Sequence, residues 1–222
     1  MSGPETWILL GASRGLGRQF LQKALASSNL PRIFTFSRKF ESLPDAVEFE
    51  SSDFSREENW LSLLEKIRSL RPTRIFYFAG GGPFGLFQEK NWKDHKWSFR
   101  VSFEFPAFLL HQFLRDPQAL QQFVVIGSSI AESEADSRAS SYCAAKHALR
   151  GLITSIQKEQ KPGFDLRLFS PGYMDTDLLP ANAWPRQQAG WVKSPNEVAE
   201  MLWASIHNAD DANKHFVLKS SP

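Results

Sequence analysis

Short apolar runs alternate with amphipathic stretches along almost the whole chain. The runs are rich in β-branched and aromatic residues, and Trp7–Leu10 is apolar throughout, as a strand covered on both faces of a sheet requires. The pattern predicts strands at Trp7–Leu10, Arg32–Phe36, Val47–Phe49, Arg74–Ala79, Phe123–Gly127, Phe164–Phe169 and His215–Leu218.

The stretches between these runs have apolar residues at helical spacing. In the segment 57–70, for example, Trp60, Leu64 and Ile67 recur on one helical face. Ser194-Pro195 is a typical start for the last helix, whereas Pro106 should bend a long one. The predicted helices are Arg18–Ala26, Glu57–Leu70, Trp92–Leu114, Ser140–Gln160 and Asn196–Ile206.

This alternation predicts the fold class. Strands connected through helices run parallel to one another, because each crossover returns the chain to the same end of the sheet. The chain shows no internal repeat, low-complexity segment or linker. We therefore expect residues 1–222 to form a single α/β domain, with a doubly wound parallel sheet of about seven strands and helices on both faces.

Charge and composition exclude several classes of function. The 26 basic residues nearly balance the 24 acidic ones, which gives no electrostatic argument for binding nucleic acid. The single cysteine, Cys143, excludes an internal disulfide and a metal site built from cysteines. The five histidines show no metal-ligand spacing, so we expect no bound metal.

No membrane segment is expected. The uncharged stretch Ile75–Gln88 is short and is interrupted by Pro83 and several glycines, whereas a spanning helix needs ~20 apolar residues. The first residues lack the basic start and the small-residue cleavage site of a secretory signal. We therefore expect a cytoplasmic protein without a membrane partner.

The first chemical signal is the glycine-rich turn Gly11–Gly17, which joins the first strand to the first helix. Glycines let the backbone turn tightly and approach a pyrophosphate, and the following helix N-terminus supplies free N–H groups. Such a turn can also be purely structural. Its place at the first strand–helix junction favours a dinucleotide site.

The end of the second predicted strand indicates which dinucleotide. A site for NAD carries an acidic residue there to bind the ribose 2′-hydroxyl, but this strand ends Ser37-Arg38-Lys39. Arg14 lies in the glycine turn, which folds towards the same place. Two guanidinium groups and a hydroxyl are suited to binding a 2′-phosphate. Arg38 alone could instead lie on the solvent-exposed edge of the sheet.

A second signal combines Tyr142, Lys146 and Ser129. Residues i and i+4 of a helix share a face, so the phenol and the ammonium can enter one cleft, where the cation should lower the pKa of the tyrosine. Ser129 follows the fifth predicted strand, at the sheet edge where ligands bind in open α/β folds. Considered separately, Tyr142 and Lys146 could be a pair on the protein surface, and Ser129 could cap a turn.

Together these motifs resemble the short-chain dehydrogenase/reductase family over nearly the whole chain, which implies a Rossmann-like fold. Gly11–Gly17 is similar to the family's cofactor loop, and Asp53 to the acid that contacts the adenine amine. Ala79-Gly80 resembles the end of its Asn-Asn-Ala-Gly segment. Ser129 precedes Tyr142 by 13 positions, the usual spacing of the catalytic pair, and Pro171–Thr176 resembles the Pro-Gly-x-x-x-Thr segment beside the nicotinamide.

The resemblance implies a role for each matching position. Tyr142 would exchange a proton with the substrate oxygen, Ser129 would hydrogen-bond that oxygen, and Lys146 would bind the nicotinamide ribose and lower the tyrosine pKa. The expected cofactor is NADP(H). The expected cofactor-binding residues are Gly11, Ser13, Arg14, Gly15, Leu16, Gly17, Ser37, Arg38, Asp53, Phe54, Ala79, Gly80, Gly81, Tyr142, Lys146, Pro171, Gly172, Met174 and Thr176.

Two positions depart from the family pattern. Ser102 stands where the family has the asparagine that helps to hold a water in its proton relay, so Ser102 joins the expected catalytic residues in its place. Tyr77-Phe78 replaces the Asn-Asn pair, so the amides that brace the sheet are missing. We expect an oxidoreductase acting on a carbonyl or alcohol; a regulator or scaffold that binds the nucleotide without turnover is the alternative.

The sequence leaves the substrate open. The segment 176–194 should form a short substrate lid, and Leu178, Leu179, Trp184 and Trp191 would give it an apolar wall. A homodimer or homotetramer is expected, because the predicted helices Trp92–Leu114 and Ser140–Gln160 are apolar on more than one face, as is usual for paired helices. Those apolar residues are Phe99, Phe103, Phe108, Leu109, Ala148, Leu149, Leu152 and Ile156.

Overall fold

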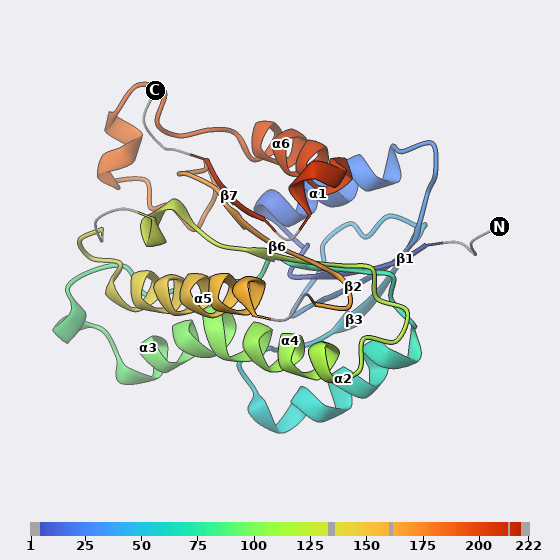
Figure 1. Cartoon of the computed structure of the whole chain (residues 1–222). Coiled ribbons are helices and arrows are strands. Elements are labelled where there is room, and N and C mark those ends of the chain that lie inside the picture. The colour runs from blue at the N-terminus through green and yellow to red at the C-terminus, as the bar shows by residue number, and fades with distance from the viewer. Residues whose placement is uncertain (1–4, 133–135, 160–161, 213, 219–222) are drawn as a thin grey trace.

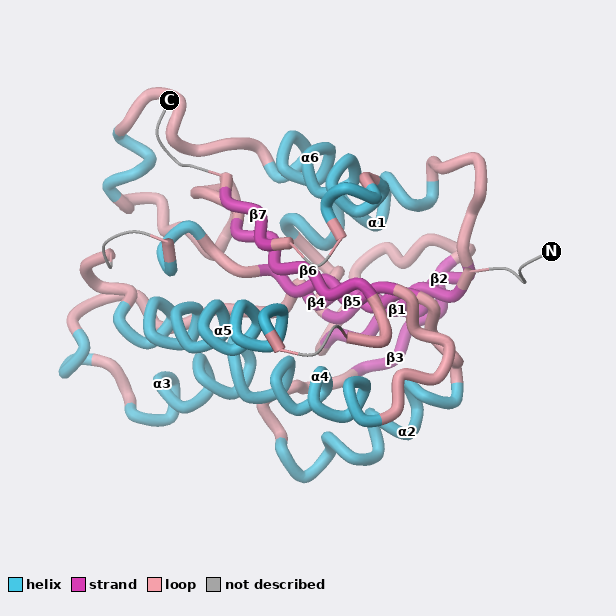
Figure 2. Tube along the Cα trace, in the orientation of Figure 1, coloured by secondary structure: helices cyan, strands magenta, loops and turns pink. Residues whose placement is uncertain are grey.

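A computed structural model describes residues 5–132, 136–159, 162–212 and 214–218. Its centre is one parallel sheet with the strand order β3-β2-β1-β4-β5-β6-β7, shown in Figure 2. The strands are β1 (Thr6–Leu10), β2 (Arg32–Ser37), β3 (Val47–Ser51), β4 (Arg74–Tyr77), β5 (Gln122–Ile126), β6 (Asp165–Ser170) and β7 (His215–Val217).

Helices cover both faces of this sheet (Figure 1). Helices α1 (Gly15–Leu25) and α6 (Pro195–His207) lie on one face. Helices α2 (Trp60–Ser69), α3 (Trp92–Phe99), α4 (Phe105–Arg115) and α5 (Ser140–Lys158) lie on the other. The predicted fold class is therefore confirmed.

Two apolar layers hold the sheet between the helices. On one face, Phe20 and Leu21 of α1 and Leu202 of α6 are buried against the sheet. On the other face, the layer is formed by α2, α4 and α5, with Ile67 and Leu149 among its fully buried residues. Residues of β1 alternate between the two layers, which explains why its sequence is apolar without interruption.

The predicted elements agree with the structure to within three residues at either end, except for one long helix. The fourth strand ends at Tyr77, because the chain leaves the sheet there to form one wall of a cleft. The predicted helix Trp92–Leu114 consists of α3, a π-helical turn at Arg100–Glu104, and α4. Pro106 has no N–H to donate to the carbonyl of Ser102, so a regular helix is interrupted at this point. Gln160, the predicted end of α5, lies outside the described residues.

Most of the apolar residues that suggested paired helices, on the predicted helices Trp92–Leu114 and Ser140–Gln160, pack within the chain. Leu109 and Leu149 are fully buried, and Phe103, Phe108 and Ile156 pack against the same core at their edges. Oligomerisation therefore stays a prediction. Among the helices that the structure describes, none combines the length and hydropathy of a membrane span.

The asparagine pair that would brace the sheet is missing, but Tyr77 supplies a bracing contact of its own. Its side chain is fully buried at the end of β4, and its hydroxyl donates a hydrogen bond of 2.6 Å to the carbonyl oxygen of Val101 in the π-helical turn. Burial raises the pKa of Tyr77 well above its usual value, so the hydroxyl keeps its proton. The tyrosine thus ties the central sheet to the turn that carries Ser102.

Replacing Tyr77 with phenylalanine should therefore destabilise the protein. The ring and its packing stay, but the buried carbonyl of Val101 loses its donor, which costs about 1–3 kcal/mol in the free energy of unfolding. Urea denaturation of the wild type and Tyr77→Phe measures the difference. An unchanged midpoint would show that this hydrogen bond does not brace the turn.

Candidate functional site

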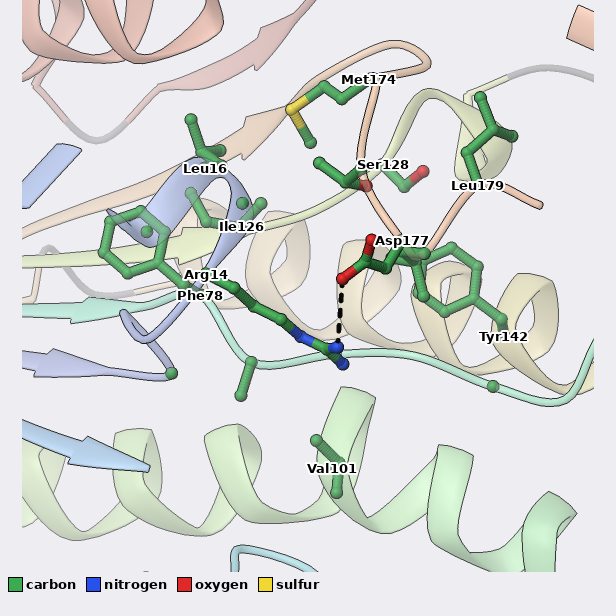
Figure 3. Close-up of a pocket in the computed structure, with 18 of the residues that line it drawn as sticks. Arg14, Leu16, Phe78, Val101, Ile126, Ser128, Tyr142, Met174, Asp177 and Leu179 are labelled. Atoms are coloured by element: carbon green, nitrogen blue, oxygen red, sulfur yellow. Dashed lines mark ion pairs between the residues drawn. The ribbon is translucent and has the colours of Figure 1, made fainter. Parts of the chain in front are cut away.

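A cleft of about 880 Å³ opens at the carboxyl ends of the central strands. The order of strands reverses between β1 and β4, so the loops that follow these two strands lead to helices on opposite faces of the sheet. A crevice forms between such loops in open α/β sheets. Figure 3 shows residues of this cleft, among them Leu16, Phe78, Ile126, Met174 and Tyr142.

The glycine turn brings the backbone of β1 against the end of β4. Gly11 has a φ of 88°, and a Cβ there would lie 2.7 Å from the backbone nitrogen of Ala79. A Cβ on Gly17 would likewise lie 2.8 Å from the Cα of Ala12. Side chains at these positions would therefore push the two walls apart or fill the cleft.

The N-terminus of α1 opens into the cleft. Its N-cap residue, Arg14, makes no side-chain hydrogen bond to the first turn, and no acidic side chain lies there. The first N–H groups of such a helix and its positive dipole end form a site for an anion. A pyrophosphate group fits this glycine-lined position.

The same end of the cleft is basic. Arg14, Arg38 and Lys39 all line it, and Ser37 lies beside them with its hydroxyl bonded to the carbonyl of Lys39. The guanidinium of Arg38 lies 5.7 Å from the centre of the Trp97 ring. These cations and the hydroxyl are chemically suited to a phosphate group.

Arg14 also reaches across the mouth of the cleft. Its Nη1 lies 3.5 Å from a carboxylate oxygen of Asp177, the ion pair drawn in Figure 3. The two side chains are 70% and 84% exposed, so solvent weakens this pair and a stronger anionic ligand could replace Asp177.

Asp53 and Phe54 lie in the wall at the basic end. The Asp53 carboxylate accepts hydrogen bonds from the backbone N–H and hydroxyl of Ser55, at 3.0 and 2.7 Å. These contacts hold the carboxylate in place, and its side chain remains 32% exposed. It can therefore still accept a hydrogen bond from a ligand amine.

Tyr142 and Lys146 lie together in the cleft, at the start of α5. Lys146 is 2% exposed, and its Nζ donates a 2.7 Å hydrogen bond to the carbonyl of Ile126 while lying 5.6 Å from the centre of the Tyr142 ring. No acidic group of the described residues lies within 4.0 Å of Nζ. Burial therefore lowers the pKa of Lys146 to about 7.

The pKa of Tyr142 differs from the sequence expectation. Burial raises it to about 12, and a hydrogen bond with the side chain of Ser128 offsets only part of this effect. The lowering of the tyrosine pKa that was expected from Lys146 does not prevail, because the effect of burial is larger. Tyr142 is consequently protonated at neutral pH and able to donate a proton.

The hydroxyl beside Tyr142 belongs to Ser128, whereas the sequence analysis expected Ser129 there. Ser128 lines the cleft and hydrogen-bonds Tyr142, and Figure 3 shows the two side chains in the same part of it. Ser129 does not line the cleft; it begins the 3₁₀ turn Ser129–Ala131, and its N–H donates to the carbonyl of Pro171 at 2.8 Å. The turn thus points the Ser128 side chain into the cleft and keeps Ser129 out of the cleft lining.

Ser102 lies behind the cleft wall. Its hydroxyl accepts from the N–H of Gly81 and donates to the carbonyl of the same residue, both at 3.1 Å. Ser98 also donates to that carbonyl, at 2.7 Å. A Cβ on Gly80 would lie 3.2 Å from Nζ of Lys146 and 3.6 Å from Oγ of Ser102, so these two groups approach the same glycine.

The cleft therefore gathers most of the residues expected from the sequence. Three of the expected residues do not line it: Gly81, Ser102 and Ser129. Those that do line it are Gly11, Ser13, Arg14, Gly15, Leu16, Gly17, Ser37, Arg38, Asp53, Phe54, Ala79, Gly80, Tyr142, Lys146, Pro171, Gly172, Met174 and Thr176.

Some residues of the site carried no sequence signal. Arg186 donates hydrogen bonds to the carbonyls of Thr176, Leu179 and Pro180, and so shapes the segment expected to be the substrate lid. His95 of α3 pairs with Ser141 at 2.5 Å and fixes the turn of α5 next to Tyr142. Both contacts join segments whose closeness depends on the fold. The sequence showed the serine pair 128–129, but it did not show which of the two side chains points into the cleft.

Comparisons with known proteins show the family and the fold of the chain. The sequence profile of the short chain dehydrogenase family matches residues 5–186. No curated protein sequence matches the chain. Among solved structures, BdcA in complex with NADPH has a TM-score of 0.79 at 21% identity, over 99% of this chain and 94% of that one.

Two further structures show the same fold. A short chain dehydrogenase family protein from Francisella tularensis has a TM-score of 0.77 at 15% identity, over 98% of both chains. An alcohol dehydrogenase from Thermococcus sibiricus, complexed with 5-hydroxy-NADP, has a TM-score of 0.73 at 19% identity, over 97% of this chain and 96% of that one. The protein belongs to the short-chain dehydrogenase family, a family of nicotinamide-dependent oxidoreductases.

Proposed function

We propose that the protein is an NADP-dependent oxidoreductase that reduces a carbonyl compound to an alcohol, with Tyr142 as the proton donor. The observation that carries this proposal is the pair of Tyr142 and Lys146 in a cleft whose other end is lined by Arg14 and Arg38. The family supports a nicotinamide cofactor, and the two arginines support NADP over NAD.

A bound nicotinamide supplies the hydride, and the side chains handle the charge that then develops on the carbonyl oxygen. The raised pKa of Tyr142 keeps its hydroxyl protonated, so it can hydrogen-bond the oxygen and transfer a proton as negative charge builds. Lys146 lies near the ring and provides a partial positive charge close to neutral pH.

We assign the second hydroxyl at this oxygen to Ser128. It lines the cleft and bonds Tyr142, so both donors can reach one oxygen. Its Oγ also accepts from the N–H of Ile130 at 3.4 Å, which orients the hydroxyl proton away from that N–H. Ser102 would act indirectly, by holding Gly81 and the wall beside Lys146.

The cofactor preference can be tested by calorimetry. NADPH should bind at least about tenfold more tightly than NADH, since each charge-assisted contact is worth ~1.5–3 kcal/mol before solvent screening at these exposed arginines. Replacing Arg14 and Arg38 together with alanine should remove the preference. Arg115→Ala, an exposed arginine at the end of α4, is the control and should keep it. Equal affinity of the wild type for both cofactors would contradict the assignment.

The mechanism can be tested with a panel of carbonyl compounds and NADPH, read by loss of nicotinamide absorbance. Tyr142→Phe keeps the ring and removes only the proton, so turnover should fall by about 10² or more while NADPH affinity is kept. Full turnover in Tyr142→Phe would disprove the assigned role. Binding of NADPH by the wild type without reduction of any compound would favour the regulator or scaffold instead.

The neighbouring serines provide a matched pair of variants. Ser128→Ala should lower kcat/KM about ten- to hundredfold, the cost of one hydrogen bond to a developing charge. Ser129→Ala should have a much smaller effect on kcat/KM, because Ser129 does not line the cleft. A larger loss in Ser129→Ala than in Ser128→Ala would return the role to Ser129.

A further inference from the structure

The wall of the cleft near Tyr142 contains a carboxylate that the proposed reaction does not use. Asp136 lies just before α5 and lines the cleft together with Ala139 and Tyr142. It is half-buried, and its charge is close enough to Cys143 to add to the effect of burial in raising the pKa of that thiol. Asp136 therefore lies close to the first turn of α5, the turn that carries Tyr142.

Among the described residues, Asp136 has one polar side-chain partner, which cannot satisfy its charge. The hydroxyl of Tyr173 lies 2.7 Å from both of its carboxylate oxygens. One hydroxyl has a single proton to donate, whereas a carboxylate can accept about four hydrogen bonds. Within the described part of the chain, no lysine, arginine or histidine nitrogen lies within 4.0 Å of Asp136.

The other carboxylates of this region are paired. Asp175 forms an ion pair of 2.5 Å with Arg186, and Asp177 pairs with Arg14 at 3.5 Å. Lys146, the only lysine of the cleft near Tyr142 among the described lining residues, is held by the carbonyl of Ile126. Asp136 is thus the carboxylate of this region that no described cation neutralises.

Tyr173 holds the carboxylate at a fixed place in the cleft. Tyr173 follows Pro171-Gly172, and its ring packs against Trp184 and Trp191, with centres 5.9 and 6.4 Å away. These two tryptophans do not line the cleft; they support Tyr173 from behind. The side chain that contacts Asp136 is consequently part of a rigid aromatic cluster, which fixes the position of the charge.

We propose that Asp136 selects substrates that carry a protonated amine, so that the cleft reduces amino-substituted carbonyl compounds better than neutral or acidic ones. A charged amine would donate hydrogen bonds to the carboxylate lone pairs of Asp136 that Tyr173 leaves unused. Charge-assisted hydrogen bonds of this kind are about twice as strong as neutral ones. A substrate carboxylate would meet a like charge and be disfavoured. This proposal rests on the proposed function.

The test compares two aldehydes of the same shape. 4-(Dimethylaminomethyl)benzaldehyde carries an ammonium charge at neutral pH, and 4-isobutylbenzaldehyde is its neutral isostere; 4-formylbenzoate supplies the anion. With NADPH, the wild type should show a kcat/KM at least tenfold higher for the cation than for the isostere, and lowest for the anion. Similar values for cation and isostere would overturn the proposal.

Asp136→Asn should remove the preference without harming reduction itself. The ratio of cation to isostere should fall to within about twofold of unity, and kcat/KM for the isostere should change less than threefold. Glu65→Gln removes an equal charge from the exposed face of α2 and should leave the ratio unchanged. An equal loss for both aldehydes in Asp136→Asn would assign Asp136 a structural role and refute the selection.

A binding measurement separates this proposal from the proposed function. N,N-Dimethylbenzylamine, titrated into the protein with NADPH by calorimetry, should bind the wild type at least tenfold more tightly than Asp136→Asn. If neither aldehyde is reduced but this difference is found, the reductase assignment fails and Asp136 remains an amine-binding residue. If the aldehydes are reduced but the amine binds both proteins equally, the amine selection alone is wrong.

Discussion

The close contact between the ends of β1 and β4 is the constraint on which the site depends. Gly11, with a φ of 88°, lies where a Cβ would be 2.7 Å from the nitrogen of Ala79, and its own N–H donates to the carbonyl of Phe36. Three strands are thereby joined at the point where the strand order reverses. From there the chain turns into α1 on one face, while the segment after β4 crosses to the other. The free N–H groups of α1, the basic edge after β2 and the glycine wall after β4 all meet at the cleft because this contact leaves no room for a side chain.

The electrostatics around Tyr142 and Lys146 follow from burial rather than from opposite charges. Lys146 is almost completely buried and is held by a main-chain carbonyl, so its pKa falls to about 7. The same dry surroundings raise the pKa of Tyr142 to about 12. Both groups thus tend towards their neutral forms at physiological pH, which keeps a proton on the tyrosine while a partly charged amine remains nearby. This balance suits proton donation to an oxygen that gains negative charge.

The wall that faces Tyr142 and Lys146 contains residues that look unfavourable in the sequence. Tyr77 replaces an amide, yet its hydroxyl reaches the carbonyl of Val101 and holds the π-helical turn against the sheet. Ser102, on that turn, binds both backbone polar groups of Gly81. Two hydroxyls therefore connect β4, the glycine wall and the helix behind it, and the bracing is retained through different atoms.

The sequence by itself determined the class of fold and the composition of the cofactor end. Strand and helix periodicity, the glycine spacing of residues 11–17 and the lack of an acid after β2 are local properties, because each depends on neighbouring residues and their backbone requirements. The directions in which side chains point, and the distances between them, depended on the tertiary structure. Ser128 and Ser129 are chemically identical neighbours, and only the 3₁₀ turn anchored to Pro171 decides which one faces Tyr142. The pKa values of Tyr142 and Lys146 likewise could not be read from their i, i+4 spacing, since burial by distant segments outweighs the effect of one charge on the other. Asp136 and Tyr173 are 37 positions apart, so their contact arises only when the fold brings the start of α5 beside the segment after β6.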